Sequence, residues 1–197
     1  MAHTVTLIAD HKGFTKPKVV GDEYRVRARV NITTYREAVV TTTCNLVAAA
    51  NTITRASGTE IFQPTVGRHI QIDNPANAGN GGPNIKLVTA VTSTVLTVDA
   101  TEGGGISNDA SGDEVAISHA YEPLTAAEFG LKSIVSMNVI GQESLLHQFT
   151  PVVGVLGTNT MASPTTELEL SAVVRSTGVN AATSDLGFIT VEVYGNL

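Results

Sequence analysis

Alternation of apolar and polar side chains is the strongest signal along this chain. It is clearest between residues 24 and 33, where every second residue is apolar: Tyr24, Val26, Ala28, Val30 and Ile32 face away from Arg25, Arg27, Arg29, Asn31 and Thr33. A period of two places the two groups on opposite faces of a β-strand, as in an antiparallel sheet with one buried face and one face in water.

The second half of the chain repeats this pattern. Residues 133–140, 166–175 and 186–194 each predict a strand of mixed or alternating character. The apolar run 145–156 contains Pro151, which lacks an amide donor, so part of this run is expected at a sheet edge or a bend.

One helical turn interrupts the strands at residues 124–131, Leu-Thr-Ala-Ala-Glu-Phe-Gly-Leu. Thr125 and Glu128 have the spacing of a capping box, in which each residue satisfies an amide at the start of the turn. Gly130 is a natural stop, because it adopts a left-handed conformation without strain. We expect this turn to deliver the chain into the strand that follows.

The middle of the chain has a different character, with short strands between glycine-rich loops. Residues 66–73, 85–91, 94–99 and 114–118 predict strands, and Thr92-Ser93 predicts a tight hairpin. These segments predict a small β-barrel-like domain of residues 51–118, inserted into the main domain.

The main domain is then discontinuous, residues 1–50 plus 119–197, with an N-terminal arm at residues 1–18. In this interpretation residues 37–44 pair with the strand 24–35. Strands before the insert pair with strands after it, because neither half alone has enough strands to close a sandwich. The predicted fold class is all-β: a jelly-roll-like β-sandwich with an inserted β-barrel-like domain and one short helical turn.

Composition supports an ordered protein and restricts its chemistry. Hydrophobic residues make up 42% of the chain and charged residues 15%, which is typical of a globular core. The single cysteine, Cys44, excludes an internal disulfide, and we expect it to be a small buried apolar residue. Neither a signal peptide nor an apolar run of about 18 residues is evident, so we expect a protein made in a cytoplasm that does not cross a membrane.

Charge is distributed unevenly along the chain. Residues 1–50 carry seven basic and four acidic groups, residues 51–119 three and seven, and residues 120–197 two and seven, which gives +3, −4 and −5, a net charge of −6. An acidic chain with few aromatic residues argues against nucleic-acid binding.

Arg25, Arg27 and Arg29 are the most notable charged feature. They fit two interpretations: the solvated face of a sheet, or a basic strip that docks on an acidic partner surface. Lys16 and Lys18 of the arm extend the second interpretation, so these five residues form the candidate partner interface.

Other chemistry-bearing residues lack the context that a site requires. Asp10, His11 and His3 are too few and too loosely spaced for a metal motif, and Glu167 and Glu169 suit a solvated strand face. The glycine clusters 79–82 and 103–105 lack the lysine and helix of a phosphate loop. We therefore expect no enzyme, no catalytic residue, no cofactor and no metal.

Two segments carry a resemblance to a known group of proteins. Residues 121–131, followed by Ile134, and the closing strand 188–195, Phe-Ile-Thr-Val-Glu-Val-Tyr-Gly, resemble the small β-sandwich decoration or cement proteins of tailed-phage capsids. The likeness extends loosely to residues 20–45, and the insert is similar to small β-barrel modules of phage head and tail proteins. The resemblance implies a structural protein without enzyme activity or cofactor.

The functional hypothesis is therefore a phage capsid decoration (cement) protein. It would bind the outer surface of the shell between capsomers, with the major capsid protein as partner, as a homo-oligomer for which a trimer is favoured, and without nucleic-acid or membrane binding. Its location would be the virion surface. The alternatives are a phage tail, neck or fibre-associated component, and a β-sandwich carbohydrate-binding module or hydrolase.

Overall fold

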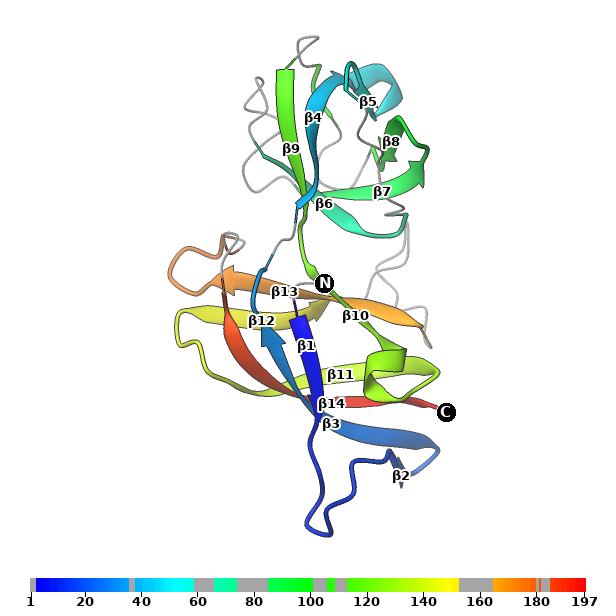
Figure 1. Ribbon diagram of the computed structural model, residues 1–197, viewed down its shortest axis with the longest axis vertical. Coiled ribbons are helices and arrows are strands. Elements are labelled where there is room, and N and C mark those ends of the chain that lie inside the picture. Colours follow the sequence, from blue (N-terminus) through cyan, green and yellow to red (C-terminus); the bar gives the residue numbers. More distant parts are fainter. Residues whose placement is uncertain are drawn as a thin grey trace. The chain divides into compact units, whose positions relative to one another are not determined.

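The computed structural model describes residues 3–35, 38–58, 66–73, 85–100, 106–108, 113–152, 165–179, 181 and 185–197. Two compact units make up the chain (Figure 1). Residues 1–35 and 121–197 form the first unit, and residues 36–120 form the second. The described chain is built from β-strands with short 3-10 turns, so the predicted all-β class is confirmed.

The first unit is a β-sandwich of two antiparallel sheets. The larger sheet has the order β1-β3-β14-β11, with the short strand β2 also paired to β3. Its strands are β1 (His3–Leu7), β2 (Lys18–Val20), β3 (Glu23–Ile32), β11 (Ser133–Gln142) and β14 (Gly187–Asn196). The predicted strands at 24–33, 133–140 and 186–194 are thereby confirmed, and they lie side by side.

The smaller sheet has the order β10-β13-β12. Its strands are β10 (Glu122–Thr125), β12 (His147–Val152) and β13 (Glu167–Val174). The strand β12, which contains Pro151, lies at the edge of this sheet, where a residue without an amide donor is tolerated. The edge position expected from the sequence is confirmed.

The inner faces of the two sheets form one apolar core. Val26, Ala28 and Val30 of β3 are buried together with Leu168 and Leu170 of β13. One polar contact is enclosed with them: the amide of Ala172 donates a hydrogen bond of 2.9 Å to the hydroxyl oxygen of the fully buried Tyr35. In β3 the alternation seen in the sequence therefore selects the buried face.

The turn η4 (Ala126–Phe129) follows β10 directly. Glu128 Oε2 accepts hydrogen bonds from the Thr125 amide at 2.7 Å and from the Thr125 hydroxyl at 2.8 Å. Gly130 ends the turn with φ of 68°, and Phe129 is fully buried in the sandwich core. The predicted capped turn is confirmed.

The second unit is a closed barrel with the strand order β4-β5-β8-β7-β6-β9. A 3-10 turn, η1 (Ala48–Ala50), joins the first two strands. The strands are β4 (Ala38–Val47), β5 (Thr52–Arg55), β6 (His69–Asp73), β7 (Ile85–Val91), β8 (Val95–Val98) and β9 (Asp113–His119). Its own apolar core includes Cys44, Ile53 and Leu96. The hairpin expected at Thr92-Ser93 joins β7 to β8, and the Thr92 amide donates to the Val95 carbonyl at 2.8 Å.

The boundary between the units differs from the sequence interpretation. We expected the insert to span residues 51–118 and residues 37–44 to pair with the main-domain strand 24–35, whereas the barrel unit spans residues 36–120. Within the described chain, β4 pairs with β5 on one side and β9 on the other. The two sides of β3 are already paired, one with β1 and β2 and the other with β14. β4 is therefore a barrel strand, and that part of the prediction is wrong.

Candidate functional site

The outer face of the larger sandwich sheet carries the arginines of β3. Arg27 and Arg29 are exposed and Arg25 is half-buried, while Val26, Ala28 and Val30 between them point into the core. Strand β14 runs beside them in register, with Arg27 opposite Glu192 and Arg29 opposite Thr190. The cationic strip predicted from the sequence is thus a real face of the sheet.

Part of this charge is balanced by Glu192 within the chain. Arg27 Nε donates a hydrogen bond of 2.6 Å to Glu192 Oε1, and Arg25 Nη1 lies 3.7 Å from the same oxygen. The hydrogen bond from Arg27, with the positive charges of both arginines, lowers the pKa of Glu192 below its ordinary value. One acidic side chain therefore serves two arginines, so a cationic surplus remains on this face.

Arg29 lies in a different setting. Its guanidinium carbon lies 4.3 Å from the centre of the Phe188 ring, a cation–π contact. A hollow of about 250 Å³ surrounds the pair and is also lined by Gly141, Gln142 and Glu143. Arg29 is thus separated in environment from Arg25 and Arg27, although all three share one strand.

The predicted N-terminal arm, residues 1–18, is only partly an arm, because residues 3–7 form β1 and Lys18 begins β2, both paired with β3. The name arm is kept below for residues 8–17, which join β1 to β2 and fold into a tight turn around Asp10. Asp10 Oδ1 accepts hydrogen bonds from the amides of Lys12 at 2.8 Å and Phe14 at 2.9 Å. Its other oxygen, Oδ2, lies 2.5 Å from Lys18 Nζ. The hydrogen bond with Lys18 and the two amide donors lower the pKa of Asp10 to about 2. Asp10 therefore stays ionised and fixes the arm to the start of β2.

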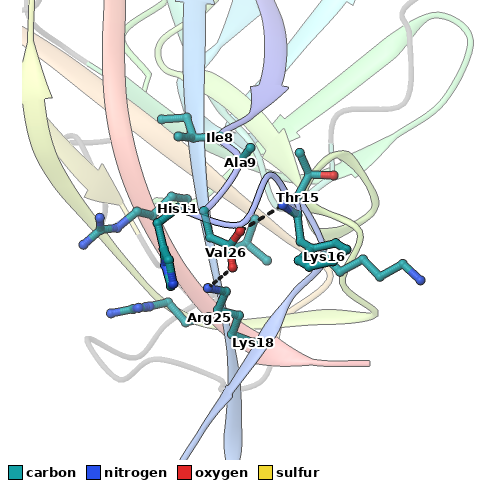
Figure 2. A pocket seen from close by; sticks show the side chains of 11 residues that line it. Ile8, Ala9, His11, Thr15, Lys16, Lys18, Arg25 and Val26 are labelled. Atoms are coloured by element: carbon teal, nitrogen blue, oxygen red, sulfur yellow. Dashed lines mark hydrogen bonds and ion pairs between the residues drawn. The ribbon is translucent and has the colours of Figure 1, made fainter.

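The arm and β3 together enclose a pocket of about 320 Å³ (Figure 2). Four of the five candidate interface residues line it: Lys16, Lys18, Arg25 and Arg27. Phe14 and Ile8 supply an apolar part, with 60% and 40% of their surface exposed. The structure therefore brings four of the candidate residues together and places Arg29 in the neighbouring hollow.

A second polar cluster, which the sequence did not indicate, lies inside the sandwich. His3 Nδ1 is 2.5 Å from Glu122 Oε1, and His3 Nε2 is 2.7 Å from Glu128 Oε1. The side chains of His3 and Glu122 are almost fully buried. The three residues come from β1, β10 and η4, so the cluster joins the two sheets.

The protonation of His3 follows from this geometry. A ring with a carboxylate oxygen at each nitrogen satisfies both by donating twice, which requires the charged imidazolium. Burial acts to lower the pKa of His3, but the hydrogen bonds and charges of Glu122 and Glu128 outweigh it, so the pKa is raised above 6.5. Burial likewise acts to raise the pKa of Glu128, yet its bonds from Thr125 and His3 lower it below 4.5.

The structure also shows the surroundings of several weaker candidate site residues. His3 and Asp10, considered together as possible metal ligands, are each engaged elsewhere, and no group of three or more His, Cys, Asp or Glu side chains suited to a metal ion occurs in the described part of the chain. Cys44 is fully buried, as expected, and burial raises the pKa of its thiol to about 11. Glu169 is only 6% exposed, so the interpretation of a solvated face is wrong for this residue.

The glycine clusters 79–82 and 103–105, which we did not expect to bind phosphate, lie outside the described residues. Within the residues that the structure describes, no helix is long and apolar enough to cross a membrane.

Comparison of the chain with protein-family models, with curated proteins and with solved structures gives no match. The fold and the site define a β-protein of two compact units with a cationic surface on the sandwich unit.

Proposed function

We propose that this protein is a decoration (cement) protein of a tailed-phage capsid, which binds the outer surface of the shell between capsomers and stabilises it. The major capsid protein is its partner, and a homo-oligomer, with a trimer favoured, is the form that binds. Its place is the virion surface, and it acts without catalysis, cofactor, nucleic acid or membrane.

The cationic surface of the arm and β3 is the observation that carries this proposal. Lys16, Lys18, Arg25 and Arg27 gather on one pocket of a chain whose net charge is −6. Such an uneven distribution suits a protein that orients one face toward an acidic surface and keeps the rest of its surface away from it.

The rigidity of this surface also supports a structural role. Asp10 and Glu192 hold Lys18 and Arg27 in place by ion pairs of 2.5 and 2.6 Å. Groups that are already ordered lose little conformational entropy on binding. Many copies, each adding a modest contact, stabilise the shell in proportion to their occupancy.

Shell binding tests the proposal directly. Purified capsids that lack the protein are incubated with it at about 50 and 300 mM salt, and occupancy and the melting temperature of the shell are measured. We expect saturable binding, a higher shell melting temperature, and weaker binding at high salt. The oligomer is determined by light scattering.

A neutralised variant provides the sharper test. Replacement of Arg25, Arg27 and Arg29 by glutamine keeps hydrogen-bond donors next to Glu192 but removes three charges, and should lower occupancy at low salt by about tenfold or more. The matched control is Lys132→Gln, an exposed lysine of the same unit outside the strip. A strict monomer that binds glycans, or labelling of the tail alone in virion images, would refute the proposal.

A further inference from the structure

The pocket between the arm and β3 combines features that a generic basic face lacks. Four cations and the anion Asp10 line it; Asp10 pairs with Lys18, while Glu192, outside the lining, pairs with Arg25 and Arg27. The local balance is thus four positive against two negative charges, a surplus of two. Lys16 is exposed and forms no ion pair within the described chain.

Cationic and apolar side chains line the same pocket. In Figure 2 the side chain of Lys16 extends away from Arg25 and His11, with Lys18 between them. Phe14 and Ile8 line the same pocket, and both are more exposed than is usual for large apolar side chains. The pocket therefore combines cations that point in different directions with exposed apolar side chains.

The walls of the pocket are formed before any ligand arrives. The Asp10 amide donates to the Phe14 carbonyl at 2.8 Å, and the Gly13 amide donates to the Asp10 carbonyl at 2.9 Å. Gly13 has φ of 82°, a conformation that glycine adopts without strain. The Ile8 amide donates to the Arg27 carbonyl at 2.9 Å, which ties the arm to β3. This preorganisation favours a specific occupant.

We propose that this pocket binds a short, turned acidic segment of a partner protein, in which an apolar residue lies between two carboxylate residues. The apolar side chain contacts Phe14 and Ile8, one carboxylate faces Arg25, and the other faces Lys16. Alternate residues of a fully extended chain lie roughly 7 Å apart and point to the same side, whereas the residue between them points away. The segment is therefore turned at its apolar residue, so that all three side chains face the pocket.

Charge decides the class of ligand. A surplus of two positive charges matches two carboxylates, while a nucleic acid brings one charge per nucleotide and needs a longer basic surface. The rest of the chain is acidic and repels a long polyanion. The exposed apolar side chains also have no partner in a free phosphate ion.

This inference rests on the proposed function only in identifying the partner as the shell surface, so it is tested without a shell. The probe is a capped peptide, Gly-Glu-Leu-Glu-Gly, titrated into the full chain at about 25 mM salt and followed by amide chemical shifts in NMR. We expect shift changes at Phe14, Lys16 and Arg25, and a dissociation constant on the order of 1 mM.

Two matched peptides separate the contributions. Gly-Gln-Leu-Gln-Gly removes both charges and Gly-Glu-Ser-Glu-Gly removes the apolar side chain, and each should bind at least about fivefold more weakly. Inorganic phosphate and a short single-stranded DNA serve as the other anions. Equal binding of the glutamine peptide, stronger binding of phosphate or DNA, or no binding of the glutamate peptide would each overturn the proposal.

Variants locate the binding in the pocket. Lys16→Glu and Phe14→Ser change exposed side chains and should each weaken the glutamate peptide at least about fivefold, while Lys132→Glu should have no effect. If all three variants bind the glutamate peptide with the same affinity, the peptide does not bind in this pocket. If shell binding depends on the arginines but the peptide does not bind, the proposed pocket is wrong and the proposed function stands. If the peptide binds but the protein does not bind the shell, the proposed function is wrong and the pocket stands.

Discussion

At the scale of single residues, His3 shows how one side chain connects distant parts of the chain. Its ring lies between Glu122 and Glu128, which are 119 and 125 residues away in sequence. Because the side chains of His3 and Glu122 are buried, water cannot replace the lost partner if the ring is removed.

His3→Gln should therefore destabilise the sandwich by about 3 kcal/mol near pH 6, because two carboxylates then face each other across an uncharged amide. Because the pKa of His3 is raised, the stability that its charged ring contributes is fully present below pH 6.5. It is lost as the pH rises through the folded-state pKa. The difference in unfolding free energy between the wild type and the variant should therefore shrink between pH 6 and pH 9.

Urea denaturation at several pH values measures this difference. The lowered pKa of Glu128 adds a second pH dependence at the acidic end. The stability that its carboxylate contributes is present above pH 4.5 and is lost as the pH falls through the folded-state pKa. His11→Gln, in the exposed arm, is the control and should keep the wild-type pH dependence. A His3→Gln difference that grows with pH would contradict the charged state inferred for His3.

Gly195 is a second position where the addition of one carbon atom should change the stability of the fold. A Cβ there would lie 2.0 Å from the Ser133 carbonyl oxygen and 3.0 Å from Leu131 Cδ1. Gly195→Ala should lower the free energy of unfolding by about 2 to 3 kcal/mol, because β11 and β14 must move apart. Gly141→Ala on the same sheet meets only Thr190 at 3.6 Å, an ordinary contact, and should be much milder in thermal unfolding.

At the scale of elements, the turn η4 makes two kinds of contact, one that caps the turn itself and one with β1. Glu128 accepts from Thr125 through Oε2 and faces His3 through Oε1, so one carboxylate both caps the turn and holds β1. The turn thus links the local structure that the sequence encodes to the tertiary structure around it.

Gly130 ends this turn in the left-handed region, where an added Cβ would meet no atom within 4 Å. Gly130→Ala should therefore cost about 1 kcal/mol from backbone strain alone. Gly130→Asn should cost less, because asparagine tolerates this conformation better. Thermal unfolding of both variants tests the order, and an alanine variant as stable as the wild type would show that the turn relaxes.

At the scale of the whole molecule, the chain contains two separate cores. The sandwich core and the barrel core share no residue. The sandwich strands on either side of the barrel segment pair directly with one another, as β3 does with β14. Each unit thus has what an independent fold requires.

Replacement of residues 36–120 by a flexible linker of about ten glycine and serine residues should leave a folded sandwich. We expect a β-type circular dichroism spectrum and a cooperative melting transition. The deletion variant also carries the complete pocket, so it should bind the acidic peptide as the full chain does. An unfolded product would show that the sandwich depends on the barrel.

Much of the fold could be predicted because it depends on local pattern. The alternation around Arg27, the capping spacing of Thr125 and Glu128, and Pro151 at an edge each reflect steric rules that act over a few residues. Arg25, Arg27 and Arg29 were identified in the same way, since exposed charge on a strand follows from its period, whereas Lys16 and Lys18 were added as basic residues of the arm.

The all-β class, the two faces of β3 and the capped turn follow from the sequence alone. Four features emerge only in the folded chain: β4 joins the barrel, Glu192 balances the arginines, His3 lies between two carboxylates, and the arm forms a pocket with β3. Local pattern specifies which way a side chain points, whereas the pairing of separate segments depends on which edges and cores remain unfilled when the whole chain has folded. Arg27 and Glu192 are 165 residues apart in sequence, and His3 and Glu122 are 119 residues apart.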